Sequence, residues 1–154
     1  MFVVSAAVTL PVGVVRTARP HDAVEVLEIE RECFEESNEG LILEACGVTE
    51  SFLVYDVGDG ICGYVLGSIE DPGTARVTSL AVREECRRSG VASALMDELV
   101  ERFRRRDFDR VVLEVRVSND GARSLYAGLG FGISAVKMEY YSDGEDAFLM
   151  EREL

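Results

Sequence analysis

Apolar residues recur along the chain with two periodicities, and the change from one to the other marks the boundaries of the predicted elements. Alternating or β-branched runs predict strands over Val12–Ala18, Phe52–Val57, Ile61–Ile69, Thr74–Val82, Arg110–Val117, Phe131–Tyr141 and Ala147–Glu153. Spacings of three and four residues predict helices over Pro20–Phe34, Leu41–Ala45, Asn119–Leu129 and from Val91 into Arg102–Arg106. This order predicts an α+β fold with a central mixed, mostly antiparallel sheet, helices on both faces and one crossover connection.

The length of 154 residues is that of one domain. No repeat and no linker interrupts residues 14–154, which we expect to form it. Residues 1–13 carry no charge, and they lack the basic start of a secretory signal. We treat them as an N-terminal extension of uncertain status, which is either an edge strand or the product of a start codon placed too far upstream.

A glycine-bearing turn lies between the predicted strand Thr74–Val82 and the long helix, and it carries the clearest chemistry. It reads Arg87-Arg88-Ser89-Gly90-Val91-Ala92. A turn that opens a helix presents unpaired backbone N–H groups and the positive end of the helix dipole. The pattern therefore predicts an anion site, and the ligand we expect there is a pyrophosphate.

Other phosphate and catalytic motifs are missing from the sequence. There is no Gly-Lys pair for a Walker loop, and there is no G-x-S-x-G or H-E-x-x-H motif. Gly128, Gly130 and Gly132 follow a helix instead of a strand, which is the wrong context for a dinucleotide fingerprint. The R-x-x-G-x-A turn has no competitor.

Charge is distributed unevenly, and the net charge is −13. Residues 1–75 hold 14 acidic residues and three arginines, whereas residues 76–154 hold 15 acidic and 13 basic residues. This balance disfavours nucleic acid as a partner, and no run is apolar enough to span a membrane. Lys137 is the only lysine, and a chain rich in acids and poor in lysine suits a salty cytoplasm, which we keep as a hypothesis.

The four cysteines form no C-x-x-C pair and have no histidine at metal-ligand spacing. We expect reduced thiols in a cytoplasmic protein without a metal. Cys86 stands out because it directly precedes the anion turn.

Several ordered motifs resemble those of the GNAT acetyltransferase superfamily. They are Leu80-Ala81-Val82, the R-x-x-G-x-A turn, Leu113-Glu114-Val115-Arg116-x-Ser118-Asn119, Leu125-Tyr126-x-x-x-Gly130-Phe131 and Tyr140-Tyr141-x-x-Gly144-Glu145-Asp146-Ala147. Together they look like the branch that acetylates protein N-termini, which includes the ribosomal-protein-alanine acetyltransferases and their archaeal relatives. The resemblance implies the GNAT fold, in which two parallel strands splay apart, here Thr74–Val82 and Arg110–Val117.

The resemblance also implies acetyl-CoA as the cosubstrate. Its pantetheine would pair with the backbone around Leu80, Ala81 and Val82. Asn119 would contact it as well. The positions implied to hold the pyrophosphate are Arg87, Arg88, Ser89, Gly90, Val91, Ala92 and Ser93.

Two residues are implied to be catalytic. Glu114 would accept the proton of the attacking amine through a water, and Tyr126 would give its phenolic proton to the CoA thiolate. From the local pattern alone, Glu114 is equally an ion-pair partner for Arg116 or Arg76. A core aromatic is the commoner role of a lone tyrosine on a helix, and only the motif around Tyr126 favours the catalytic one. No cysteine lies where a covalent acetyl intermediate would need one, so we expect direct attack in a ternary complex.

The acceptor side rests on weaker signals. Phe34, Glu35, Tyr140 and Tyr141 are the expected substrate-binding residues, although the tyrosines are equally a strand-edge pair. The Pro-aromatic pair that bacterial members carry after Cys33-Phe34 is replaced here by acidic residues. The expected activity is acetyl transfer to the α-amine of protein or peptide N-termini, with ribosomal proteins among the candidates. The alternatives are a GNAT enzyme for a small-molecule amine and a non-catalytic acetyl-CoA-binding module.

Overall fold

The computed structural model of the protein describes residues 12–154. The N-terminal extension expected over residues 1–13 lies, up to residue 11, outside the described residues. Among the residues described, no helix is long and apolar enough to cross a membrane.

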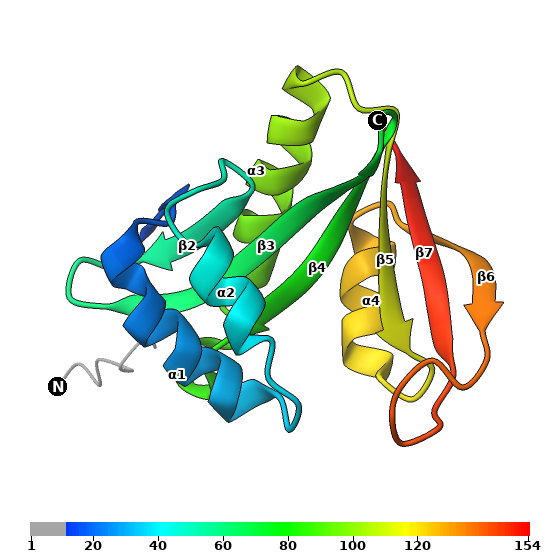
Figure 1. The fold of residues 1–154 in the computed structure, drawn as a ribbon, viewed down its shortest axis with the longest axis horizontal. Coiled ribbons are helices and arrows are strands. Elements are labelled where there is room, and N and C mark those ends of the chain that lie inside the picture. Colours follow the sequence, from blue (N-terminus) through cyan, green and yellow to red (C-terminus); the bar gives the residue numbers. More distant parts are fainter. Residues whose placement is uncertain (1–11) are drawn as a thin grey trace, which may run out of the picture. The chain divides into compact units, whose positions relative to one another are not determined.

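The elements follow the predicted order (Figure 1). The strands are β1 (Val14–Thr17), β2 (Phe52–Asp56), β3 (Ile61–Asp71), β4 (Thr74–Val82), β5 (Arg110–Arg116), β6 (Gly132–Lys137) and β7 (Ala147–Glu153). The helices are α1 (Ala23–Cys33), α2 (Glu39–Ala45), α3 (Val91–Arg105) and α4 (Asp120–Gly128), with short 3₁₀ turns η1 (Pro20–Asp22) and η2 (Glu84–Cys86).

The strands form one sheet in the order β1-β2-β3-β4-β5-β7-β6. Pairing is antiparallel between β1 and β2, between β5 and β7 and between β6 and β7, whereas β4 and β5 are parallel. The mixed, mostly antiparallel sheet expected from the sequence is thereby confirmed. Within unit 2, the β4–β5 ladder pairs Thr74–Arg76 with Arg110–Val112.

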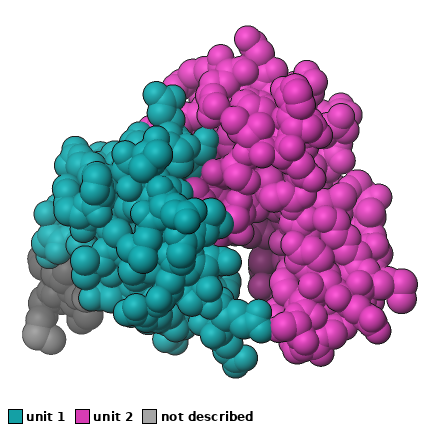
Figure 2. All heavy atoms as spheres, in the orientation of Figure 1, with its two compact units in different colours: residues 1–64, 80–95 teal, residues 65–79, 96–154 magenta. Residues whose placement is uncertain are grey.

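The chain divides into two compact units, coloured separately in Figure 2. Unit 1 comprises residues 1–64 and 80–95, and unit 2 comprises residues 65–79 and 96–154. Because β3, β4 and α3 each contribute residues to both units, each unit is described by itself below.

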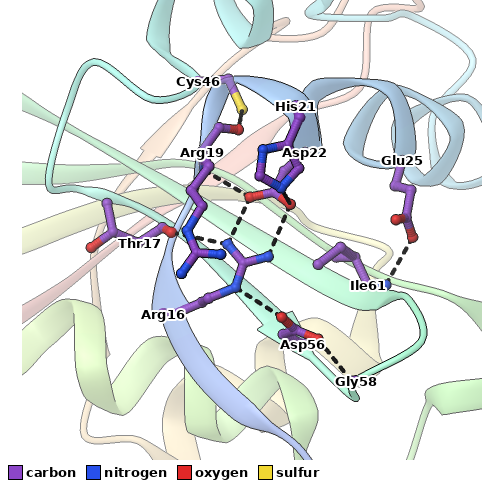
Figure 3. A network of polar contacts seen from close by, with 10 residues as sticks. All are labelled: Arg16, Thr17, Arg19, His21, Asp22, Glu25, Cys46, Asp56, Gly58 and Ile61. Carbon is purple, nitrogen blue, oxygen red and sulfur yellow. Dashed lines mark hydrogen bonds and ion pairs between the residues drawn. The ribbon is translucent and has the colours of Figure 1, made fainter.

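In unit 1, the first turn of the helical region is tied to the paired strands β1 and β2 by Arg16 and two aspartates. The guanidinium donates to Asp22 Oδ2 at 2.7 Å and Oδ1 at 2.9 Å, and it donates to Asp56 Oδ2 at 2.9 Å (Figure 3). Asp22 also accepts the Arg19 backbone N–H at 2.7 Å, which caps η1. This network fixes where α1 begins.

In unit 2, α3 packs closely on β3 at Gly67. A Cβ built on Gly67 would lie 2.7 Å from the Phe103 ring and 3.1 Å from Leu99, so this position excludes any side chain. Phe103 and Leu99 are fully buried, and they lie on the apolar stripe that predicted the helix.

The predicted end of one strand needs correction. The predicted strand Phe131–Tyr141 ends at Lys137, so Tyr140 and Tyr141 lie in the β6–β7 loop and not at a strand end. The strand stops there because Glu139 adopts a left-handed conformation (φ 51°), which is incompatible with extended backbone. In α1, the buried positions are Ala23, Val26, Ile29 and the ionisable Glu30.

Candidate functional site

The turn before α3 exposes a row of backbone donors. The peptide N–H groups of residues 88–93 donate no hydrogen bond to any described part of the chain, and the first bond of the helix runs from Ala94 N to Gly90 O at 3.0 Å. Arg88 and Gly90 have φ of 59° and 83°, a left-handed conformation that turns successive N–H groups toward one side. Free N–H groups at the start of a helix are the donors that the predicted anion site would need.

The side chains of this turn point to neighbours in the chain. Arg87 Nε donates to the Val82 carbonyl at 3.1 Å, and its Nη2 lies 3.4 Å from Cys33 Sγ. Ser89 Oγ donates to the Cys86 carbonyl, which stabilises the turn. The backbone of the turn, and not the Arg87 guanidinium, is therefore its free donor surface.

The same unit brings the end of α1 to the end of β4. Cys33 Sγ contacts the Val82 carbonyl at 3.6 Å as well as Arg87. Ala81 and Val82 are buried, whereas Leu80 is half-buried. The expected pantetheine strand and the start of the loop after α1 thus meet at Cys33.

In unit 2, Glu114 on β5 lies between two cations. Its Oε1 accepts from Lys137 Nζ at 2.6 Å, and its Oε2 accepts from Arg76 Nη1. The Glu114 side chain is 8% exposed. Burial would raise its pKa, but the hydrogen bonds from Lys137 and Arg76 outweigh burial, so the pKa of Glu114 lies below its ordinary value.

The pair with Arg76 is one of the two structural roles that the sequence left open for Glu114. The other role, a pair with Arg116, is not found, because Arg116 pairs with Asp143 and Glu145. The surface around the cations is hollowed, and this hollow is lined by Glu70, Asp71, Thr74, Arg76, Arg110, Val112, Lys137, Leu149 and Glu151. A group entering the hollow would reach both cations that hold Glu114.

Tyr126 lies on α4 and packs edge-on against Phe131, with ring centroids 6.1 Å apart. Burial raises its pKa to about 12, and the neighbouring Tyr141 adds to the shift. The phenol therefore keeps its proton throughout the neutral range, which a proton donor requires.

Asn119 is the N-cap of α4, because its Oδ1 accepts the Ala122 N–H at 3.1 Å. This bond accounts for an asparagine here without any ligand. Its side-chain amide N–H₂ group remains the part that could serve as a donor to a cosubstrate.

Tyr140 and Tyr141 stack edge-on with centroids 5.0 Å apart. Arg116 holds their loop: its guanidinium lies 4.0 Å over the Tyr141 ring, and its Nη1 donates to Asp143 Oδ2 at 2.8 Å and Glu145 Oε1 at 2.9 Å. Tyr140 is 47% exposed, so its ring is available to a ligand.

Phe34 and Glu35 follow α1 directly, and both are exposed. They belong to unit 1, whereas Glu114, Tyr126 and the two loop tyrosines belong to unit 2. Each unit thus holds one part of the predicted set, and the geometry stated above is that within each unit.

Sequence reasoning missed Lys137 as a partner of Glu114, and it missed Glu30 as a buried carboxylate at the end of α1. Lys137 carried a signal, because it is the only lysine and lies shortly before the tyrosine pair. Glu30 carried a signal as a carboxylate on the apolar side of a helix. Among residues 12–154, no three His, Cys, Asp or Glu side chains gather as a metal-binding group.

The comparisons with known proteins agree on one family. The sequence profile described as "Acetyltransferase (GNAT) family" matches residues 21–131. An uncharacterized N-acetyltransferase of Methanocaldococcus jannaschii is 42% identical over 132 residues, which cover 84% of this chain and 83% of that protein. An N-alpha-acetyltransferase of Saccharolobus solfataricus is 38% identical over 117 residues, which cover 68% of this chain and 70% of that protein.

The fold agrees as well. The crystal structure of Ard1 from Thermoplasma volcanium superposes with a TM-score of 0.86 at 38% identity, over 92% of this chain and 97% of that one. The profile match covers most of the chain, and the parallel pairing of β4 with β5 fits the expectation drawn from the resemblance. The chain therefore belongs to the GNAT family of acetyltransferases.

Proposed function

We propose that this acetyltransferase moves the acetyl group of acetyl-CoA to the N-terminal α-amine of proteins or peptides, by direct attack in a ternary complex. The observation that carries the donor half of the proposal is the row of free N–H groups over residues 88–93. The acceptor half is supported by the relative named an N-alpha-acetyltransferase.

The turn fits the pyrophosphate of acetyl-CoA on chemical grounds. Successive N–H groups and the start of a 15-residue helix, α3, favour a group with two or three negative charges. Gly90 has open space around it, since nothing lies within 4 Å of a Cβ built there. A phosphate can therefore approach the backbone closely.

The acceptor must lose a proton to attack the thioester. An α-amine has an ordinary pKa near 8 and a lysine amine one near 10.4, so the α-amine costs about 3 kcal/mol less to deprotonate at neutral pH. This difference favours an α-amine for an enzyme whose candidate base is weak. Glu114 is such a base, since two cations hold its pKa low.

In the proposed mechanism, the carboxylate of Glu114 accepts the ammonium proton through a water molecule. The amine nitrogen then forms a bond with the acetyl carbon, and the carbon–sulfur bond of the thioester breaks. Tyr126 donates a hydrogen bond to the departing sulfur and passes its proton as negative charge develops there. The newly bonded nitrogen loses its second proton, which passes through water to the Tyr126 phenolate, and Glu114 releases the first proton to solvent. The amide product and CoA then leave an enzyme in which both residues have returned to their starting states.

We place the enzyme in the cytoplasm, where acetyl-CoA and newly made N-termini are both present. The four cysteines are free, as expected in a reducing compartment. Ribosomal proteins remain candidates for the acceptor.

The proposal is tested with acetyl-CoA and a peptide library varied at the first two residues, in low and in molar KCl. We expect acetylated α-amines, and a matched library with blocked N-termini should give no product. Turnover of small amines alone would replace the proposal with a small-molecule enzyme. Binding of acetyl-CoA without turnover of any amine would replace it with a non-catalytic module.

A further inference from the structure

Glu30 carries a carboxylate that is fully buried in the interior of unit 1. It lies on α1 and is 0% exposed, and the equally buried Ile29 and Ile42 lie on the same pair of helices. None of the described Lys, Arg or His residues forms an ion pair with it within 4 Å. A buried carboxylate is costly unless hydrogen bonds satisfy both oxygens, so its partners decide what it does.

The two oxygens of Glu30 have different partners. Oε2 accepts the hydroxyl proton of Tyr64, a fully buried residue of β3. Oε1 accepts the backbone N–H of Asn38 at 3.0 Å. One oxygen is therefore fixed by the core, and the other reaches the residue that caps the start of α2.

The segment between these anchors is the loop Phe34–Asn38, whose residues are all exposed. It begins directly after Cys33, whose sulfur contacts the Val82 carbonyl and the Arg87 guanidinium. The loop thus starts beside Val82 and Arg87, two residues expected to contact acetyl-CoA. At its other end, the bond from Asn38 to Glu30 fixes it to the interior.

We infer that Glu30 is a positioning residue for the acceptor: its carboxylate holds Phe34–Asn38 in the conformation that receives the substrate peptide. This inference rests on the proposed function, which assigns peptide binding to Phe34 and Glu35. Without the Glu30 bond, the exposed Asn38 N–H bonds to water and the loop becomes mobile. Each binding event must then order the loop, which weakens peptide binding and leaves the chemical step unchanged.

The test compares Glu30→Met with Glu30→Gln. Methionine fits an apolar interior of the same size but accepts no strong hydrogen bond from Asn38. Glutamine keeps a carbonyl oxygen for the Asn38 N–H and turns its amide toward the Tyr64 oxygen. We expect E30M to raise KM for the peptide about tenfold, while kcat and the Kd of acetyl-CoA change by less than about twofold. E30Q should stay close to wild type.

Matched measurements separate this role from a general loss of stability. Glu28→Met changes the same residue type at an exposed position of the same helix and should leave all three constants unchanged. Hydrogen exchange at the Asn38 amide should accelerate in E30M and not in E28M. If E30M does not fold, Asn38→Pro serves as the second variant. It removes the same N–H from the loop, at a residue whose φ is −93°, and it should raise KM for the peptide by a similar factor.

An unchanged peptide KM in E30M or N38P would overturn the inference, and so would an E30Q enzyme as impaired as E30M. Failure of the proposed function is a different result, namely a wild-type enzyme that acetylates no peptide. In that case, hydrogen exchange at the Asn38 amide still decides whether Glu30 fixes the loop. If this exchange is no faster in E30M than in the wild type, Glu30 does not fix the loop.

Discussion

Lys137 Nζ lies 2.6 Å from Glu114 Oε1, so the only lysine of the chain is paired with the candidate base of the reaction. Arg76 binds the other oxygen of the same carboxylate. The two cations keep Glu114 ionised, and they also reduce its strength as a base. If Glu114 is the base, as we propose, Lys137 sets the pH range of the enzyme without touching a reacting atom.

Replacing Lys137 with methionine should raise the pKa of Glu114. The carboxylate then loses one of the two hydrogen bonds that lower its pKa, while its burial, which raises the pKa, remains. The acidic limb of kcat against pH should move to higher pH. Steady-state rates from pH 4 to 9 measure this shift.

The matched control is Glu114→Gln, which removes the base altogether. It should lower kcat about 100-fold and remove the acidic limb. A full rate in E114Q, or an acidic limb in K137M that stays at the wild-type pH, contradicts the role of Glu114.

Replacing Tyr126 with phenylalanine should lower kcat about 10- to 100-fold, because the departing sulfur loses its proton donor. The pKa of Tyr126 is raised to about 12, so the phenol stays protonated across the measurable range. The shape of the pH profile should therefore be the same in Y126F and wild type, in contrast to K137M. A Y126F enzyme with wild-type kcat would show that Tyr126 is only a packing aromatic beside Phe131.

Replacing Gly90 with alanine should weaken acetyl-CoA binding about tenfold. Gly90 has φ of 83°, and a non-glycine residue pays about 1–2 kcal/mol for this conformation, so the turn relaxes away from it. No neighbour lies within 4 Å of the added Cβ, which excludes a clash as the cause. Isothermal titration with acetyl-CoA gives the Kd.

Gly40→Ala is the control for this prediction. Gly40 lies in α2, also has open space around its Cβ position, and is not among the glycines with positive φ. G40A should leave the Kd unchanged. If G40A and G90A change the Kd equally, the backbone conformation of Gly90 does not contribute to acetyl-CoA binding.

Replacing Asp22 with asparagine should destabilise the fold by about 3 kcal/mol, because it removes a buried carboxylate from the two-pronged pair with Arg16 (Figure 3). The hydrogen bond from Arg16 lowers the pKa of Asp22 in the folded state. Its stabilisation is therefore complete above the unfolded pKa near 3.9 and is lost as the pH falls through the lower, folded pKa.

Urea unfolding at a series of pH values checks this prediction. The free energy of unfolding should fall on acidification in the wild type, and the fall should be smaller in D22N. Two parallel curves would mean that other carboxylates cause the acid sensitivity.

The order of elements was predictable because it depends on local rules. The strand Thr74–Val82 and the turn at Gly90 follow from β-branched runs and glycine chemistry, and the structure reproduces both. The end of β6 was not predictable. The left-handed residue that stops the strand is Glu139, and glutamate has no intrinsic preference for that conformation.

The candidate site was also predictable only in part. Motif positions such as Glu114 and Tyr126 are visible in the sequence, but their environment is not. The pairing of Glu114 with Lys137 joins β5 to the end of β6, and that of Glu30 with Tyr64 joins α1 to β3. Contacts between distant segments depend on the fold as a whole, and no periodicity encodes them.

The central claim is that the acceptor is an N-terminal α-amine, and one competition experiment tests it most directly. A peptide with a free α-amine and an internal lysine is incubated with the enzyme and acetyl-CoA, and fragmentation mass spectrometry locates the acetyl group. The account predicts acetylation of the α-amine, with the lysine side chain unmodified. Acetylation of the lysine alone, or of neither amine, would contradict it.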